Sequence, residues 1–336
     1  MSVSPIHGAR RGMSMAEVLV ALFIMALGVI AILTLFPVGM LQIGQALKDD
    51  RTAQCAAQAD SFMRAYWKQF VVQKQAPGDA NMDFTNPGCA FFNPDAGSGG
   101  NPHGLPPTPP GSPSYPVVFD PMGYASSWGP NTSPSFQFWV GNVNVPRRPL
   151  INIASPLRTC SIMDGMDYNA NNGAANVIDR ELRYNWLWVL QRPQGTLPTE
   201  NTASMTIVVF DKRSFIYVPP GAENAFTSLT PAANGNGGAG STSVSFPTGT
   251  QLGVQKGGWI ADMTVLPPNV AGGRGTVLNA NFYRVVSVTD NGVTVDVELQ
   301  QPIQDTAASP LPSESRTWVV MANVSEVFVR PNLENQ

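Results

Sequence analysis

The feature that most limits how this chain can fold is an uncharged run from Val18 to Leu47. Its first part, VLVALFIMALGVIAILTLF, is almost wholly apolar. A helix of about nineteen residues rises roughly 29 Å, which matches the roughly 30 Å hydrocarbon thickness of a bilayer. The sequence therefore predicts one membrane span close to the N-terminus.

The charges on either side of this run predict its orientation. The leader, residues 1–12, contains His7, Arg10 and Arg11 and no acidic residue. Because positively charged flanks stay in the cytoplasm, the chain after Lys48 is expected to cross the membrane. Charged residues are only 13% of the chain, and 31 Gly and 30 Pro point to long loops, which suits an extracytoplasmic protein.

Three other types of N-terminal signal also contain an apolar segment. Two of them do not fit this sequence, and the third remains open. A secretory signal peptide has an apolar region of about 7 to 15 residues and a small-x-small cleavage site, and this run is longer. A lipoprotein leader needs a cysteine at the cut, whereas the first cysteine is Cys55. An uncleaved signal anchor remains open on hydropathy alone.

Glu17 is the one carboxylate at the edge of this uncharged run. An ionised acid in hydrocarbon costs a few kcal/mol or more, so Glu17 is expected near the interface or beside a cation. Cleavage after Gly12 would create such a cation, the α-amino group of Met13, about one helical turn away. The pair could form within one chain or between neighbouring chains.

The sequence ARRG followed by MSMAEVLVALFIMALGVIAIL resembles the class III signal of type IV prepilins and type II secretion pseudopilins. The shared features are a short basic leader ending in Gly12, an apolar helix and Glu17 at the fifth position after the cut. They cover about the first forty residues. The stretch EVLVALFIMALGVIAI is most similar to minor pilins and minor pseudopilins. Residues 13–16, Met-Ser-Met-Ala, depart from the commonest Phe-Thr-Leu-Ile.

This resemblance implies a substrate for prepilin peptidase, which cuts between Gly12 and Met13 and methylates the new amine. Gly12 lets the backbone enter a tight protease site without a Cβ, although a simple turn glycine is the alternative. Glu17 would neutralise the Met13 amine of a neighbouring subunit during assembly. The implied partners are this peptidase, other pilin or pseudopilin subunits, an inner-membrane assembly platform and membrane lipid. The implied location is the bacterial inner membrane, with the C-terminal part in the periplasm or in a surface filament.

The whole chain is predicted to have an α+β, pilin-like fold, with a long N-terminal helix packed on a C-terminal antiparallel sheet. The predicted parts are a leader (1–12), the helix (13–74), a Pro-rich irregular excursion (75–135) and a β-rich domain (136–336). In the helix, Pro37 is expected to kink or locally melt the chain. Its outer half should pack through an aromatic face of Phe62, Ala65, Tyr66 and Phe70.

Strand patterns concentrate in the C-terminal half of the chain. They are FQFWVG, YNWLWVLQR, SMTIVVFDKRSFIYV, GWIADMTVL, NFYRVVSV, VTVDVELQ and RTWVVMANVSEVFVR. Asp290-Asn291-Gly292 between two of these runs predicts a hairpin. Prolines in 76–135 disfavour helix and strand, and a second loose tract, about 219–256, is rich in Gly, Ser, Thr and Asn. Both tracts are predicted to be insertions between strands.

Composition and motifs argue against several other functions. The net charge of −3 and the absence of long basic runs show no general excess of positive charge of the kind that binds nucleic acid. His7 and His103 are the only histidines, and no triad or phosphate-loop motif occurs. We therefore predict no enzyme activity, no catalytic residue and no cofactor.

Two further candidate sites remain open at this point. The segment Asp164–Asp179 collects oxygen donors, but Asn172 and Ile178 stand where a calcium loop needs Gly and Glu, so a turn without metal is preferred. Cys89 and Cys160 are the most plausible disulfide pair of three possible pairings in an oxidising compartment. We predict no metal site.

Two other functions compete with that of a filament subunit. One is a membrane-anchored binding module, for example for a sugar or surface polymer, which never polymerises and keeps residues 1–12. The other is an anchored enzyme, which the missing catalytic constellation disfavours. Cleavage after Gly12 separates the first rival from a filament subunit.

Overall fold

A computed structural model describes the protein over residues 14–73, 116–120, 137–140, 143–146, 160–162, 167–169, 177–179, 183–193, 195, 202–213, 223–229, 238–250, 252–266, 276–304 and 316–334. Two compact units divide the chain, Met1–Arg51 and Thr52–Gln336, and each is described by itself. The predicted parts 1–12 and most of 75–135 lie outside the described residues.

The described chain holds one α-helix, one π-helical turn and sixteen strands. The helical elements are α1 (Met15–Trp67) and η1 (Lys68–Val72). The strands are β1 (Val117–Phe119), β2 (Gln137–Val140), β3 (Val143–Pro146), β4 (Asp167–Asn169), β5 (Val177–Asp179), β6 (Tyr184–Gln191), β7 (Ala203–Asp211), β8 (Glu223–Thr227), β9 (Ser243–Pro247), β10 (Trp259–Asp262), β11 (Val265–Leu266), β12 (Thr276–Val277), β13 (Asn281–Asp290), β14 (Thr294–Leu299), β15 (Thr317–Met321) and β16 (Val324–Leu333).

The long helix forms largely as the sequence predicts. It begins at Met15 and the helical path ends at Val72, two residues before the expected end. The sequence predicts a kink or local melting at Pro37. α1 continues through this residue, so the helix does not melt there. A proline removes one backbone donor, and the bonds on either side of it can carry the helix on.

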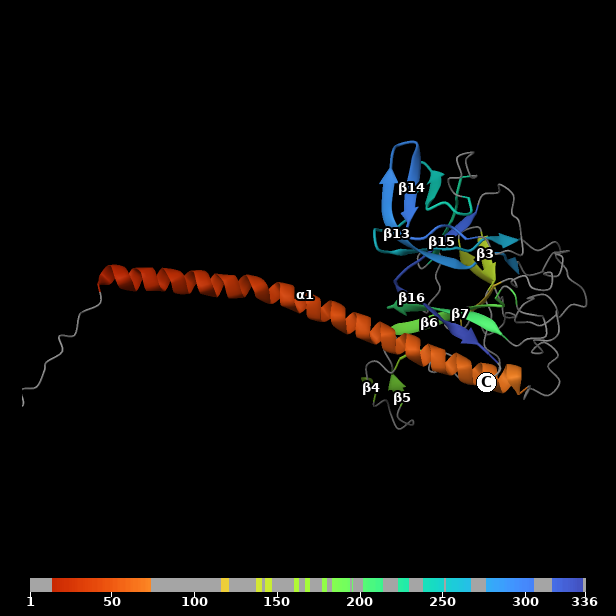
Figure 1. Cartoon of the computed structure of the whole chain (residues 1–336), viewed down its shortest axis with the longest axis horizontal. Helices are drawn as coiled ribbons and strands as arrows, with labels where there is room; N and C mark the ends of the chain where they lie inside the picture. The colour runs from red at the N-terminus through yellow and green to blue at the C-terminus, as the bar shows by residue number, and fades with distance from the viewer. Residues whose placement is uncertain are drawn as a thin grey trace, which may run out of the picture. The chain divides into compact units, whose positions relative to one another are not determined.

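The outer part of α1 packs on a four-stranded antiparallel sheet with the order β1-β6-β7-β16 (Figure 1). Small side chains at Ala56 and Ala59 let the helix approach closely, and Trp188 Nε1 donates to the Ala59 carbonyl at 3.2 Å. Phe62 stacks on Trp188 with ring centroids 5.8 Å apart. The helix therefore docks through both apolar burial and one buried hydrogen bond.

The predicted aromatic face of the helix is only partly right. Phe62 is partly buried and Tyr66 is buried in the core with Trp67, but Ala65 is exposed. The buried stripe follows Cys55, Ala59, Met63 and Tyr66, at intervals of three and four residues. Ala65 lies outside that stripe. The side chain of Phe70 lies outside the described part.

Where one sheet was predicted, two main sheets form. A six-stranded antiparallel sheet has the order β8-β15-β10-β13-β14-β9 and packs on the four-stranded sheet (Figure 1). Buried residues of β6 alternate between the helix side, such as Trp186 and Trp188, and the second sheet, such as Leu187 and Val189. Being covered on both faces, this strand carries apolar residues without alternation.

The six-stranded sheet curls so that its two edges meet. After β8, the Leu229 N–H donates to the Ser245 carbonyl of β9 at 2.9 Å, and Phe226 contacts Phe246 edge to face. The curled sheet encloses its own core around Trp318, Phe246 and Tyr283. Closure of this kind removes exposed sheet edges.

Both tracts predicted to be loose contain strands. β1 lies in the Pro-rich tract and pairs with β6, while β8 and β9 lie in the second tract and pair with β15 and β14. The Val117–Phe119 strand is buried at every position. It sits at the edge of its sheet, where the preceding Pro116 is tolerated. Three to five residues between turn formers give too little periodicity to predict such strands.

The predicted hairpin is confirmed, with its turn one residue further on than the Asn-Gly pair suggests. β13 pairs with β14 through Asp290↔Val295, and the Asn291 N–H donates to the Thr294 carbonyl at 3.1 Å. Gly292 has φ +77°, and it is the first of the two central residues. Positive φ at that position is the pattern of a type II′ turn.

We expect amides of this hairpin to exchange slowly with deuterium, because Val295, Val297 and Leu299 are buried in the core that the curled six-stranded sheet encloses. Gly292→Ala should speed exchange in 282–299, since a Cβ at positive φ costs about 1–2 kcal/mol. Val293→Ala, at the neighbouring position that is 75% exposed, is the control. Exchange throughout 282–299 at the rate of unstructured peptide in the parent would contradict this hairpin.

Candidate functional site

The described part of the N-terminal signal is a capped helix start at Ser14 and Glu17. Ser14 Oγ accepts the Ala16 N–H at 3.3 Å, and Glu17 Oε2 accepts the Ser14 N–H at 3.0 Å. The first helical bond runs from the Val18 N–H to the Ser14 carbonyl at 3.3 Å. The Glu17 carboxylate reaches back to the Ser14 N–H as in a capping box, while the Ser14 hydroxyl accepts the N–H of the second helical residue, Ala16, rather than the third. Both contacts satisfy donors that a helix start otherwise leaves unpaired.

The capping box gives Glu17 a local role that the reasoning from charge missed. The signal was present in the sequence as Ser14-Met15-Ala16-Glu17, the S-x-x-E pattern of such boxes. Gly12 and Met13, the two predicted cleavage residues, lie outside the described residues.

Beyond Glu17, α1 presents an apolar surface that its own unit does not cover. The large apolar side chains from Met15 to Leu47 are 41% to 82% exposed. In the described residues this is one helix long and apolar enough to cross a membrane. Such a surface is stable in lipid and costly in water.

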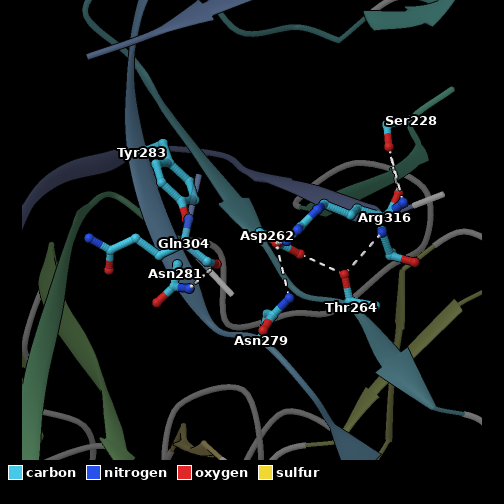
Figure 2. Close-up of polar contacts among 9 residues, drawn as sticks. Ser228, Asp262, Thr264, Asn279, Asn281, Tyr283, Gln304 and Arg316 are labelled. Atoms are coloured by element: carbon cyan, nitrogen blue, oxygen red, sulfur yellow. Dashed lines mark hydrogen bonds and ion pairs between the residues drawn. The ribbon is translucent and has the colours of Figure 1, made fainter. Parts of the chain in front are cut away.

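In the globular part, a cluster of polar side chains lies buried where the ends of β8, β10 and β15 meet (Figure 2). Asp262 is fully buried, and Arg316 Nη1 donates to its Oδ2 at 2.7 Å. Thr264 Oγ1 donates to Oδ1 at 2.6 Å, and Asn279 Nδ2 donates to Oδ2 at 3.3 Å. The Arg316 N–H in turn donates to Ser228 Oγ at 3.0 Å. Every group touching the carboxylate is a donor, so the cluster is built around an ionised acid.

The titration properties of this cluster follow from its burial. Burial raises the pKa of the Asp262 carboxyl, and Arg316 and Thr264 oppose that rise. Burial likewise raises the pKa of Tyr283 to about 12, while the Gln304 N–H donating to its hydroxyl at 2.9 Å acts the other way. Tyr283 therefore stays neutral at physiological pH. These groups are buried and hydrogen-bonded, which suits a structural role rather than contact with a substrate.

A second buried ion pair joins the chain after β1 to the chain after β7. Arg213 donates two hydrogen bonds to Asp120, at 2.9 and 2.6 Å, and its guanidinium lies 4.3 Å from the Phe210 ring centroid. This bidentate geometry is the strong form of an Arg–carboxylate pair. It ties the short strand β1 into the core.

The other predicted sites find limited support. Among the described residues, no group of three or more His, Cys, Asp or Glu side chains is placed to hold a metal. Within Asp164–Asp179, β4 and β5 pair as a ladder with Asp167 opposite Asp179. The remainder of that segment lies outside the described residues.

Cys160 is buried, and burial, with a smaller effect from Asp120, raises the pKa of its thiol. It forms no disulfide within the part of the chain that the structure describes. Cys89, its predicted partner, lies outside that part. The pairing therefore stays a prediction.

One small pocket of about 190 Å³ lies between the end of α1 and the end of β16. Its lining residues are Arg64, Ala65, Trp67, Lys68, Leu333 and Glu334. Arg64 is already engaged there, since its Nη2 donates to the Pro331 carbonyl at 2.8 Å and its Nε to Asp60 at 3.1 Å. The volume is below the usual range of small-molecule sites, about 300–1,000 Å³.

Comparisons with known proteins add little to this geometry. No family model matches the chain, and no curated protein matches it. Among solved structures, a phage phi92 endosialidase matches with 11% sequence identity and a TM-score of 0.16, over 44% of this chain and 18% of the endosialidase chain. The matched region thus spans less than a fifth of that chain, and a likeness this weak carries no argument about fold or function.

Proposed function

We propose that this chain is a minor pilin or pseudopilin, a non-enzymatic subunit of an inner-membrane-based type IV filament. The observation that carries the proposal is the order of features at the N-terminus: a basic leader ending in Gly12, then Met13, then Glu17 at the start of an uncharged apolar helix. In this role the leader is removed by prepilin peptidase, and the helix joins the filament.

The exposed helix supports this role. A subunit that moves from membrane to filament needs an exposed apolar helix surface, and the large apolar side chains from Met15 to Leu47 provide one. The outer part of the same helix packs on an antiparallel sheet, which fixes the globular part to its anchor. In this role the globular part would lie in the periplasm or on a filament surface.

A membrane-anchored binding module that never polymerises is the second candidate. One observation favours it: the capping box already gives Glu17 a structural reason to be present, without any neighbouring subunit. Such a module needs no cleavage after Gly12. Processing therefore separates the two functions.

The processing prediction is that the mature chain begins at Met13 with a methylated amine. Intact-mass analysis of the chain from cells with an active prepilin peptidase measures this directly. Gly12→Ala should be cut in part, while Gly12→Leu should block cutting, because a bulky side chain hinders backbone entry into the protease site. Recovery of the full-length parent chain from such cells would remove the prepilin assignment.

A further inference from the structure

We infer that Cys55 and Cys160 form a disulfide that fastens α1 to the four-stranded sheet when the chain folds in an oxidising compartment. This pairing differs from that of Cys89 with Cys160, which the sequence favours. The structure holds Cys55 and Cys160 as thiols and so represents the reduced chain. The inference rests on the proposed function for the compartment alone, because cytosolic thiols are kept reduced.

The register of the sheet places Cys160 on the face that α1 covers. Ser161 forms an antiparallel bridge with Asn185 of β6. Cys160 therefore lies opposite Trp186, and opposed residues point to the same face with Cβ atoms about 4.5–5.5 Å apart. Both belong to the core cluster between the sheet and the helix. Cys160 thus points toward α1.

The helix and strand β6 run in the same direction. Thr52 Oγ1 lies 3.2 Å from the hydroxyl of Ser325, at the start of β16. Arg64 Nη1 donates to the Asn332 carbonyl, near the end of β16, at 3.2 Å. β16 therefore runs along the helix in the same direction. Because β7 is antiparallel to both β16 and β6, strand β6 shares that direction too.

Cys55 lies at the level of Cys160 along this direction. The Trp188 indole donates to the Ala59 carbonyl, which fixes one matching level of strand and helix. Cys55 precedes Ala59 by four residues, about 6 Å of helix. Trp186 precedes Trp188 by two residues, about 6.6 Å of strand. The two steps match, so Cys55 comes to the level of Trp186, opposite which Cys160 lies.

Cys55 also points toward β6 rather than toward β16. Residues seven apart lie on the same side of a helix, and Phe62, seven residues after Cys55, stacks on Trp188 of β6. Cys55 and Cys160 are both 0% exposed and belong to one core cluster. A disulfide spans only about 5.5–6 Å between Cα atoms, so it needs this coincidence of level, side and burial.

The bond forms by exchange with a disulfide donor, such as a thiol oxidase or oxidised glutathione. One cysteine thiolate attacks a donor sulfur and releases the first donor thiol. The other cysteine thiolate then attacks the first cysteine's sulfur in this mixed disulfide and releases the second donor thiol. The two cysteines lose two electrons and two protons, which the donor takes up. Burial raises the pKa of the Cys160 thiol, so the exchange belongs to folding, before the core closes.

Refolding of the full-length Cys89→Ala chain tests the pairing, because this variant retains only Cys55 and Cys160. The chain is reduced and unfolded, then refolded in detergent micelles with a glutathione redox buffer, and tryptophan fluorescence confirms that it has folded. Acid quenching, alkylation in denaturant and digestion without reductant precede mass spectrometry. We expect the peptides of Cys55 and Cys160 to be linked. Two alkylated cysteines in the refolded chain would overturn the inference.

The parent chain gives a second readout under the same conditions. Its Cys160 should be linked to Cys55 and its Cys89 alkylated, and a link between Cys89 and Cys160 would overturn the inference. Reductant should lower the urea midpoint of the linked chain by about 1–2 M, because a crosslink restricts the unfolded chain. The Cys55→Ala chain is the control and should show no effect of reductant. An unchanged midpoint on reduction of the linked chain would overturn the fastening role.

Recovery of the chain from cells separates this inference from the proposed function. Chain taken from bacterial membranes under acid and alkylated in denaturant should carry the same link. A chain that links on refolding but leaves the cells with both thiols alkylated would contradict the extracytoplasmic location, and with it the proposed function. A chain that does not link on refolding overturns the inference whatever its location.

Discussion

Replacing Glu17 by valine is expected to lower incorporation into filaments more than about a hundredfold, while membrane insertion and cutting after Gly12 continue. Removing the carboxylate makes the span more apolar, so insertion should be at least as good as in the parent. In a filament, however, the Met13 amine would enter a low-dielectric environment without a partner. An uncompensated buried charge costs about 3–5 kcal/mol. Levels of cleaved protein in membranes and in sheared filaments measure the effect.

Two further variants separate charge from capping at this position. Glu17→Gln keeps the capping box and loses the charge, whereas Glu17→Asp keeps the charge on a side chain too short to close the box well. If charge drives assembly, Asp should incorporate better than Gln. The reverse order would assign the effect to the helix cap. Equal incorporation of the parent and all three variants would leave Glu17 as an interfacial acid and favour the anchored module.

Replacing Asp262 by alanine is expected to lower the free energy of unfolding by about 3–5 kcal/mol, because Arg316 would remain buried without its carboxylate. The pair is 2.7 Å long, and its side chains are 0% and 6% exposed. Denaturant titration of the full chain in micelles, followed by tryptophan fluorescence, measures the loss. Trp318 of the neighbouring strand lies in the core beside this cluster.

The chain offers a matched control in an exposed ion pair. Arg183 and Asp211 are 2.9 Å apart, but the arginine side chain is 40% exposed. Arg183→Ala should therefore cost only about 0–1 kcal/mol. The double variant Asp262→Leu/Arg316→Met should recover much of the Asp262→Ala loss, since apolar groups need no partner. An Asp262→Ala loss no larger than that of Arg183→Ala would show that the buried pair does not stabilise the fold.

The ends of the C-terminal strands show how far the sequence predicts this fold. The run RTWVVMANVSEVFVR reads as one strand segment, but Ala322 and Asn323 turn the chain, and Asn323 has φ +64°. β15 on one side belongs to the six-stranded sheet and β16 on the other to the four-stranded sheet. Local pattern identifies both strands. It does not identify their partners, because pairing depends on contacts far apart in the chain.

At the candidate site, the sequence by its own pattern predicts which residues to test. An uncharged apolar run with a single acid at its edge predicts a helix, a membrane span and a special role for Glu17, because these depend on composition and spacing along one stretch of chain. The exact contact of Glu17 with the Ser14 N–H needed three-dimensional coordinates, although its S-x-x-E pattern was visible.

The pairing of strands and of buried charges depends on contacts between distant segments. Packing placed ten of the described strands in two main sheets. It formed β1, β8 and β9 in tracts rich in turn formers, and it paired Asp262 with Arg316 and Asp120 with Arg213. These outcomes depend on burial against distant segments. A short strand is stable when both its faces and its charges find partners, and a linear pattern does not contain those partners.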